Sequence, residues 1–248
     1  MNMKKLLLAL CILMLSSCRS SVVLETFYQV YNVQSDNLIK EDRCLKFSNE
    51  DCDILYNFWS EGGDPGFIVY NKTDKDIFIN LSRTFFIKNS VANDYYKNRE
   101  YSYSGTSNSY PYLNESKSST VTYKEKPVIC IPPKSSRSIQ EYNISSDLIQ
   151  KYSPEVDFPK NSSTVFTYFI NNSPIIFSNR IMYSHDPQFT SSKFIENIFW
   201  ISEVVNYSTD RFKEIDLLSP FKFYNTYSRE TLSEQKQKEK KLNDGVYY

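Results

Sequence analysis

The strongest constraint on the fold is a repeated pattern of short β-branched and aromatic runs, separated by clusters of Asn, Asp, Ser, Pro and Lys. Such runs are typical of strands, and the clusters between them are typical of turns. We expect strands at residues 27–33, 53–59, 67–70, 77–81, 84–88, 120–123, 128–131, 138–144, 165–170, 175–183, 194–205 and 221–227. Around twelve short strands with almost no long helical period predict an all-β protein, specifically a single antiparallel β-sandwich of immunoglobulin-like type with insertions.

Four local features add detail to this prediction. The strands 67–70 and 77–81 flank a polar turn and predict a hairpin with one buried face at period two. Residues 145–147, Ser-Ser-Asp, predict the cap of a short helix that reaches Tyr152. The range 194–205 also fits a buried helix, but its many Ile, Val, Phe and Trp residues favour a strand. Three glycines in residues 61–66 indicate a tight backbone reversal rather than a ligand loop.

The first 17 residues have the pattern of an export signal. Lys4 and Lys5 precede a ten-residue apolar run, which is followed by small residues. That run is too short to span a bilayer as a helix, which takes about 20 residues. The following Leu15-Ser16-Ser17-Cys18 resembles the lipobox of bacterial lipoproteins. The resemblance implies cleavage before Cys18 and lipid on Cys18; the alternative is an ordinary signal peptide with an incidental cysteine.

The predicted domain order is a signal peptide at 1–17, a lipidated tether at 18–26, a β-sandwich at 27–227 and a charged tail, helical or disordered, at 228–248. Two or more acyl chains hold a protein stably on a membrane. By analogy with lipoprotein sorting in Gram-negative bacteria, Arg19 favours the outer membrane and leaves the side of that membrane open.

Two parts of the body, from Phe67 to Tyr96 and from Val128 to Lys134, resemble uncharacterised lipoproteins of gut-associated Gram-negative bacteria. This resemblance implies a lipid-anchored β-sandwich and assigns no functional residue.

Charge and composition argue against several classes of function. The chain has 29 basic and 29 acidic residues, which leaves no electrostatic footprint for nucleic acid. One histidine cannot supply the several imidazoles that most catalytic zinc and iron sites use, so we expect no metal. The 5 glycines form no phosphate-binding loop, so we expect no nucleotide cofactor.

Three cysteines remain in the mature chain after Cys18. Cys44 and Cys52 flank a polar turn, so a hairpin could bring them together as a disulfide; the alternative is two free thiols. Cys130 lies in an apolar run and is expected to be a small buried residue rather than a nucleophile.

Catalytic candidates are weak. Residues 183–187, Tyr-Ser-His-Asp-Pro, place a serine, a histidine and an aspartate side by side, but a triad requires these groups to meet in space, and a turn at Asp186-Pro187 is the simpler interpretation. Paired carboxylates of a glycosidase need a separation of about 5 to 9.5 Å, which a sequence does not show. We therefore predict no catalytic residue.

The segment 94–119 is the best candidate for recognition, because its 26 residues include six Tyr and seven Ser. Long loops in compact domains are usually functional or disordered, and tyrosines supply rigid contact area in binding loops. We single out Tyr101, Tyr103, Tyr110 and Tyr112 as ligand-binding candidates. The alternatives are a polar surface loop or an edge hairpin that pairs 100–103 with 110–113.

The sequence thus predicts a lipid-anchored envelope protein that acts as a non-catalytic binding or structural module for a glycan or protein ligand. An envelope glycan or peptidoglycan hydrolase is one alternative. A subunit of a larger envelope assembly is another; it predicts an exposed strand edge or apolar patch.

Overall fold

The computed structural model describes residues 25–108, 116–151, 154–215 and 219–230, together with 233, 234 and 237. Residues 27–227 form one compact unit, and residues 1–26 and 228–248 are grouped as another. The predicted signal sequence, Cys18, Tyr110 and Tyr112 lie outside the described residues. The sheets and the candidate sites belong to the unit 27–227.

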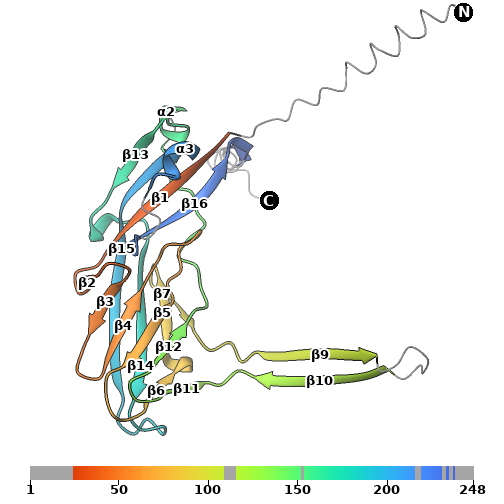
Figure 1. Cartoon of the computed structure of the whole chain (residues 1–248). Coiled ribbons are helices and arrows are strands. Elements are labelled where there is room, and N and C mark those ends of the chain that lie inside the picture. The colour runs from red at the N-terminus through yellow and green to blue at the C-terminus, as the bar shows by residue number, and fades with distance from the viewer. Residues whose placement is uncertain are drawn as a thin grey trace, which may run out of the picture. The chain divides into compact units, whose positions relative to one another are not determined.

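The described chain forms three antiparallel sheets (Figure 1). The nine-stranded sheet contains β1 (Thr26–Gln34), β6 (Ile77–Asn80), β7 (Phe85–Lys88), β8 (Val91–Asp94), β11 (Val128–Ile131), β13 (Ser162–Thr167), β14 (Ile176–Ser184), β15 (Lys193–Ser208) and β16 (Lys222–Ser228). The five-stranded sheet contains β2 (Ile39–Lys40), β3 (Leu45–Ser48), β4 (Cys52–Tyr56), β5 (Phe67–Asn71) and β12 (Ser136–Ile139). The third sheet pairs β9 (Glu100–Asn108) with β10 (Ser116–Lys124). Short helices are η1 (Leu81–Arg83), α2 (Pro154–Asp157), η2 (Ile170–Asn172) and α3 (Thr209–Phe212). The all-β prediction is confirmed.

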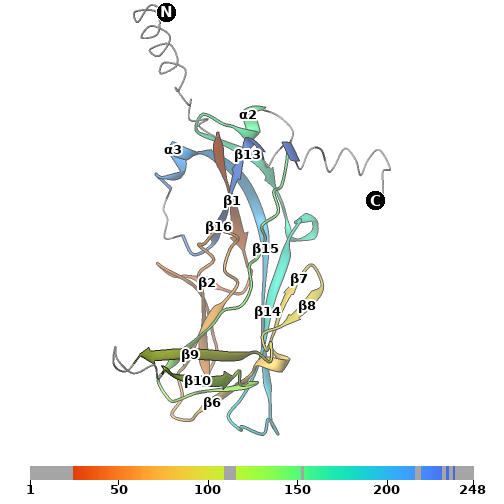
Figure 2. The same cartoon turned by 90° about the vertical axis from the view of Figure 1, so that its right-hand side faces the viewer.

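Strand β15 organises the nine-stranded sheet, because its 16 residues change partners along their length. Its first half pairs with β14, and its second half pairs with β1 and β13. Figure 2 shows β14 beside the lower part of β15, which continues upward beyond it. Ile195, Asn197, Phe199 and Ile201 of β15 are buried at period two. The strand interpretation of this segment is therefore correct, and the helix alternative is wrong.

The two larger sheets share one aromatic core. The ring centroids of Tyr56 and Phe199 lie 5.0 Å apart, and those of Phe58 and Phe177 lie 5.4 Å apart, both edge to face. The Tyr56 hydroxyl donates to Asn197 Oδ1 over 2.8 Å, so this buried phenol is paired. Edge-to-face aromatic pairs add about 0.5–1.5 kcal/mol each beyond the area that they bury. These contacts join the five-stranded and nine-stranded sheets face to face.

The hairpin expected between 67–70 and 77–81 is wrong, although both strands exist. Strand β5 pairs with β4 and β12, whereas β6 pairs with β11 and β14, so the turn between them crosses from one sheet to the other. The fully buried Asn71 holds this corner: its Nδ2 donates to the carbonyls of Lys75 and Ile131, over 2.7 and 3.0 Å, and also to that of Pro132. One amide thus fixes both crossings, 71–76 and 132–135.

The short helix expected from residues 145–147 is also wrong, because buried side chains take the hydrogen bonds that a helix would need. Gln29 Nε2 donates to the carbonyl of Ile149, and Gln29 Oε1 accepts from the Ile149 N–H. The hydroxyls of Tyr31 and Tyr227 donate to the carbonyls of Asp147 and Ser146. Backbone groups that already bond to side chains outside the segment cannot form helical hydrogen bonds. Residues 145–151 therefore form an irregular segment.

Gly62 and Gly63 both have positive φ, 78° and 71°, as the backbone interpretation of this reversal requires. A Cβ on Gly63 would lie 2.7 Å from Phe223 Cγ and 2.8 Å from Ile144 Cδ1, whereas one on Gly62 would come no closer than 3.5 Å to Asn143. The reversal therefore needs glycine at both positions for conformation and at Gly63 for space as well.

The three described cysteines are free. Strands β3 and β4 do form a hairpin, but its register pairs Ser48 with Asp53 and Leu45 with Tyr56, which puts Cys52 at the turn and Cys44 at the open end. The disulfide is therefore absent and the free-thiol alternative holds. Cys130 is exposed on β11, so the expectation that it is buried is wrong.

Candidate functional site

The Tyr-rich segment forms a ribbon rather than a loop. Strands β9 and β10 pair from Glu100 opposite Lys124 to Asn108 opposite Ser116. Neither strand pairs with any other strand that the structure describes, and Figure 1 shows the ribbon extending away from β11 and β12. The edge-hairpin alternative pairs 100–103 with 110–113, and this partner is wrong, because 100–103 pairs with 121–124. The partner of β9 begins at Ser116.

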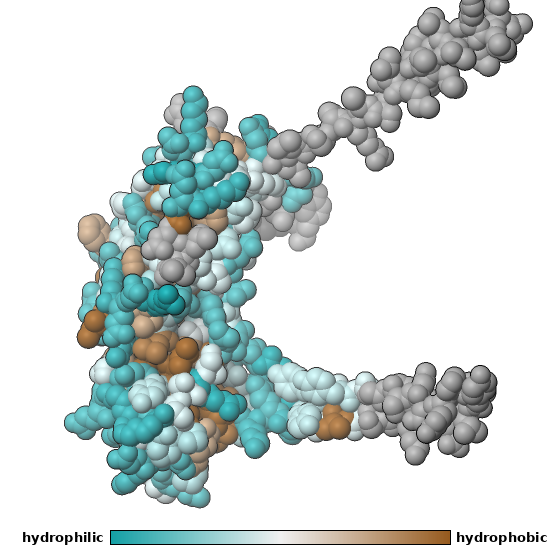
Figure 3. Space-filling model, viewed as in Figure 1, coloured by the Kyte–Doolittle hydropathy of each residue, from teal (hydrophilic) through white to brown (hydrophobic). Residues whose placement is uncertain are grey.

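The ribbon has two chemically different faces. Tyr101 lies opposite Tyr123 and Tyr103 opposite Val121, so these four side chains share one face. Their exposed fractions are 43%, 60%, 65% and 47%, respectively. The rings of Tyr103 and Tyr123 lie 6.1 Å apart, edge to face. In Figure 3, the described part of the ribbon is pale to brown along its middle and hydrophilic at its root.

The opposite face carries hydroxyl groups. Ser102 and Thr122 are 3.3 Å apart between side-chain oxygens, and the same distance separates Ser104 and Thr120. The structure thus brings together two of the four predicted tyrosines, Tyr101 and Tyr103. Tyr123 and Val121 also belong to this face, although the sequence did not single them out as site residues. The alternation in Thr120-Val-Thr-Tyr-Lys124, which mirrors Glu100-Tyr-Ser-Tyr-Ser104, is the signal that could have found them.

A clamp at the root holds the ribbon. Glu125 Oε2 accepts from the backbone N–H groups of Lys97 and Arg99, over 2.9 and 3.1 Å, while the Glu125 N–H donates to the Arg99 carbonyl. The Arg99 guanidinium pairs with Glu125 and Glu141. Burial opposes the ionisation of Glu125, but these donors outweigh it and lower its pKa. Hydrogen bonds and ion pairs therefore join the two ends of the ribbon at its root.

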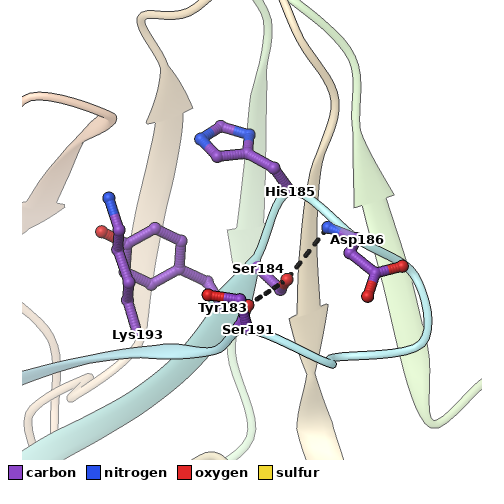
Figure 4. Close-up of a pocket in the computed structure, with 6 residues that line it drawn as sticks. All are labelled: Tyr183, Ser184, His185, Asp186, Ser191 and Lys193. Atoms are coloured by element: carbon purple, nitrogen blue, oxygen red, sulfur yellow. Dashed lines mark hydrogen bonds between the residues drawn. The ribbon is translucent and has the colours of Figure 1, made fainter.

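The neighbours Ser184 and His185 do not form a catalytic pair. The Ser184 hydroxyl donates to the Ser191 carbonyl over 2.6 Å and accepts from the Asp186 N–H over 2.9 Å (Figure 4). Figure 4 shows the His185 ring pointing away from this hydroxyl. Asp186 accepts from the N–H groups of Gln188 and Thr190, which fixes the turn at this end of β14. The turn interpretation of this string is confirmed.

His185 instead belongs to a cluster around Asp51. The Asp51 carboxylate accepts from Lys193 Nζ over 2.6 Å and from the Tyr183 hydroxyl over 2.9 Å, and it lies 3.1 Å from His185 Nε2. His185 Nδ1 lies 2.9 Å from the Asp76 carbonyl. Both oxygens that face the ring are acceptors, so the tautomer decides which ring nitrogen donates.

The electrostatics of this cluster fit a structural tie. Burial opposes the ionisation of Asp51, but hydrogen bonds from Lys193, His185 and Tyr183 outweigh it and lower the pKa of Asp51 to about 2. Burial and the adjacent Asp51 raise the pKa of the Tyr183 phenol. Neither group is tuned to exchange a proton near neutral pH. The adjacent pocket holds only about 110 Å³, whereas ligand pockets are usually about 300–1,000 Å³.

The remaining nucleophile and acid candidates are not activated. Burial raises the pKa of Cys52 to about 12, and burial together with Glu41 raises that of Cys44. Burial also raises the pKa of Asp64, but its carboxylate accepts from the Gln140 amide and the Gly66 N–H rather than facing a second carboxylate. Among the described residues, no group of three or more His, Cys, Asp or Glu side chains could hold a metal ion.

No known family matches this chain, and no curated protein or solved structure is significantly similar to it. None of the helices in the part of the chain that the structure describes is long and apolar enough to cross a membrane.

Proposed function

We propose that this protein is a lipid-anchored, non-catalytic binding module of the cell envelope that recognises a partner through the Tyr101–Tyr103–Tyr123–Val121 face of the β9–β10 ribbon. The observation that carries the proposal is the exposure of this face. Three tyrosines and a valine share one side of a two-stranded sheet that pairs with no other described strand. Tyrosines supply large, rigid contact area at low entropic cost, which makes them common in interfaces.

The shape of the ribbon favours a protein partner over a small ligand. Small-molecule sites are concave and enclose most of their ligand, whereas a two-stranded ribbon offers a narrow, flat face. Glu100 and Lys124 lie opposite each other at its root, in the row that carries the hydroxyl groups, and Lys117 lies opposite Ser107 nearer the other end of the pairing. The four residues Tyr101, Tyr103, Tyr123 and Val121 are themselves uncharged, as the centres of protein interfaces tend to be.

Lipid attachment is the second part of the proposal. It is supported by the charged start, the short apolar run and the Leu15-Ser16-Ser17-Cys18 motif. Lipid on Cys18 would tether the domain through residues 18–26, and Arg19 favours the outer membrane. The body would be a β-sandwich, since the two larger sheets pack on a shared aromatic core; the immunoglobulin-like arrangement stays a prediction.

Quantitative purification of the full-length chain from cross-linked cells tests the binding face. The test variant combines Tyr101→Ser, Tyr103→Ser and Tyr123→Ser. The control variant combines Ser102→Thr and Ser104→Thr on the opposite face, because the introduced threonines are β-branched and suit a strand. We expect a partner that co-purifies with the wild type and the control and falls at least tenfold with the triple variant. Equal recovery of all partners from the three proteins would refute the proposal, provided that their urea midpoints agree.

A second candidate function is a subunit of a larger envelope assembly. The outer edges of β9 and β10 have no strand partner in the described sheets, and unpaired edges invite another strand to add. Amide hydrogen exchange of the purified and the cross-linked protein separates the two candidates. Strand addition protects the outward N–H groups of the ribbon, whereas binding through the aromatic face leaves their exchange unchanged.

A Cys18→Ala variant tests the anchor. We expect it to leave the membrane fraction, while the wild type stays in the outer-membrane band. Retention of the variant, or a wild type wholly in the inner-membrane band, would contradict this part of the proposal. Protease treatment of intact cells then shows whether the ribbon faces outward.

A further inference from the structure

A second site, distinct from the ribbon, lies at the junction of β1, β15 and β16. A groove of about 500 Å³ opens there, lined mainly by polar groups, with the segment after β13 forming one wall. Its volume lies within the range of about 300–1,000 Å³ that is typical of ligand sites. Side chains from five separate parts of the chain line it, among them Asn32, Glu203, Phe169, Phe221, Lys40 and Lys222.

Two β-bulges, one on β15 and one on β13, lie beside this groove. On the β1 side, Asn32 pairs with Glu203 and Val33 with Ile201, so Ser202 is an extra residue. On the β13 side the register shifts between Thr164 and Phe166. Ser202 contacts both walls of the groove, because its hydroxyl donates to the Asn32 carbonyl and its own carbonyl accepts from the Tyr168 N–H over 2.7 Å. Bulges concentrate beside functional sites, where they re-aim side chains.

The polar groups of the groove match a hydroxyl-rich ligand. Asn32 Nδ2 donates to Glu203 Oε2 over 2.6 Å. In the described part of the chain, the Asn32 side-chain oxygen and the second Glu203 oxygen have no hydrogen-bond partner, and neither does the exposed Gln34 amide. These groups offer acceptors and donors side by side, as the vicinal hydroxyls of a sugar require.

Aromatic rings and cations complete the arrangement. Phe169 is 78% exposed at the rim, and Phe221 is partly buried beneath two lysines. Lys40 Nζ lies 4.2 Å from the centroid of the Phe221 ring and Lys222 Nζ lies 5.9 Å from it. Neither ammonium forms an ion pair with a described carboxylate. Two cations that share one ring and lack an anion form a ready site for a carboxylate.

We propose that this groove binds a short acidic saccharide. The C–H face of a sugar ring packs on the exposed Phe169, its hydroxyls bond to Asn32, Gln34 and Glu203, and its carboxylate pairs with Lys40 and Lys222 beside the Phe221 ring. An aromatic platform beside convergent polar groups suits a ring that is apolar on its face and polar on its edge. The Glu203 carboxylate, held by Asn32, accepts from hydroxyls and disfavours a ligand with several acidic groups at that end.

Binding of the full-length protein to a printed array of uronic-acid and sialic-acid saccharides, each beside its neutral counterpart, tests this proposal. We expect acidic saccharides to bind and their counterparts to bind at least tenfold more weakly. Lys222→Met should weaken the acidic ligand at least tenfold, and raising the salt concentration should weaken it further. Phe169→Ala should weaken binding at least fivefold. Lys75→Met, at an exposed lysine on the β5–β6 crossing, serves as the matched control and should bind as the wild type does.

Three results would overturn the proposal: no acid-dependent binding on the array, equal binding of acidic and neutral saccharides, or unchanged affinity in Lys222→Met. The triple tyrosine variant of the ribbon should keep full saccharide binding. Loss of partner binding through the ribbon can therefore be distinguished from loss of saccharide binding in the groove. Urea unfolding of each variant separates lost binding from lost structure.

Discussion

The ammonium group of Lys193 lies 2.6 Å from the carboxylate of Asp51, although the two residues are 142 positions apart in the sequence. Asp51 is in the turn between β3 and β4 of the five-stranded sheet, and Lys193 begins β15 of the nine-stranded sheet. This ion pair, with Tyr183 and His185 on the same carboxylate, ties the two sheets together at one end of the core.

Asp51→Asn should destabilise the protein by about 2–4 kcal/mol, because it leaves Lys193 and His185 beside a neutral, weaker acceptor. Asp74→Asn is the matched control: Asp74 is exposed and pairs with the exposed Lys134, so its loss should cost less than about 0.5 kcal/mol. Equilibrium urea unfolding at pH 7 measures both changes. Similar small effects in the two variants would contradict the role of Asp51 as a tie.

The same carboxylate predicts an acid-sensitive component of stability. Its pKa is about 2 in the folded protein against 3.8 for a free side chain. A carboxyl group with a lowered folded pKa stabilises the protein above its unfolded pKa and loses this contribution as pH falls through the folded value. At about 1.4 kcal/mol per pKa unit, the contribution is about 2–3 kcal/mol. Unfolding of the wild type and Asp51→Asn between pH 2 and pH 5 should show their difference shrinking below about pH 4; a constant difference would contradict this assignment.

Asn71→Ala should cost about 2–4 kcal/mol, because it removes the amide donor to the buried Ile131 carbonyl and one of the two donors to each of the Lys75 and Pro132 carbonyls. Asn71→Asp should be no better, since a carboxylate keeps the acceptor for the Thr73 N–H but offers no donor to the carbonyls. Asn37→Ala, at an exposed position, provides the control. Thermal unfolding of the three variants is the measurement, and full stability of Asn71→Asp would show that the donated bonds are dispensable.

The glycine pair predicts an unequal response to the same change. Gly62→Ala adds a Cβ that lies no closer than 3.5 Å to its neighbours. It should therefore lower the free energy of unfolding by about 1–2 kcal/mol, from the positive φ alone. Gly63→Ala has the same backbone strain and also drives a methyl group into Phe223 and Ile144, which should add about 1–3 kcal/mol. Urea midpoints of the two variants compare them directly, and equal midpoints would refute the steric part.

Glu125→Ala should loosen the ribbon without unfolding the domain. It removes the acceptor for the N–H groups of Lys97 and Arg99, so amide exchange in 101–108 and 116–124 should accelerate. Global stability should fall by less than about 1 kcal/mol, because the clamp lies outside the core. Lys126→Ala, at an exposed neighbouring position, should leave the exchange unchanged. Unchanged exchange in Glu125→Ala would contradict the clamp.

Local pattern predicted the strands well, because alternation and turn residues act over a few positions. The strand at 128–131 has the predicted bounds, and 194–205 lies wholly inside β15. Sheet partners were harder to predict, because they depend on distant bonds. Asn71 reaches Ile131 across 60 positions, and this bond helps turn an expected hairpin into a crossing between sheets.

In the candidate site, too, local features could be predicted from the sequence and features that depend on distant contacts could not. The tyrosines of 101–103 were found from composition, but the contribution of Tyr123 depends on the register of the ribbon. The partner of His185 is 134 positions away at Asp51, so no local motif could show it. The groove depends on a register shift between β1 and β15, which leaves no mark in either strand alone.

The partner change along β15 also sets an order for folding. Strand β1 can pair with β15 only after nearly the whole domain has been made, since Gln29 and Asn206 meet across 177 positions. Contacts of such long range are slow to form, because a long loop must close before they stabilise anything. Strands β3 to β5 and the β14–β15 hairpin can form earlier from neighbouring residues. We therefore expect β1 to stay open to chaperones or to aggregation until the end of folding.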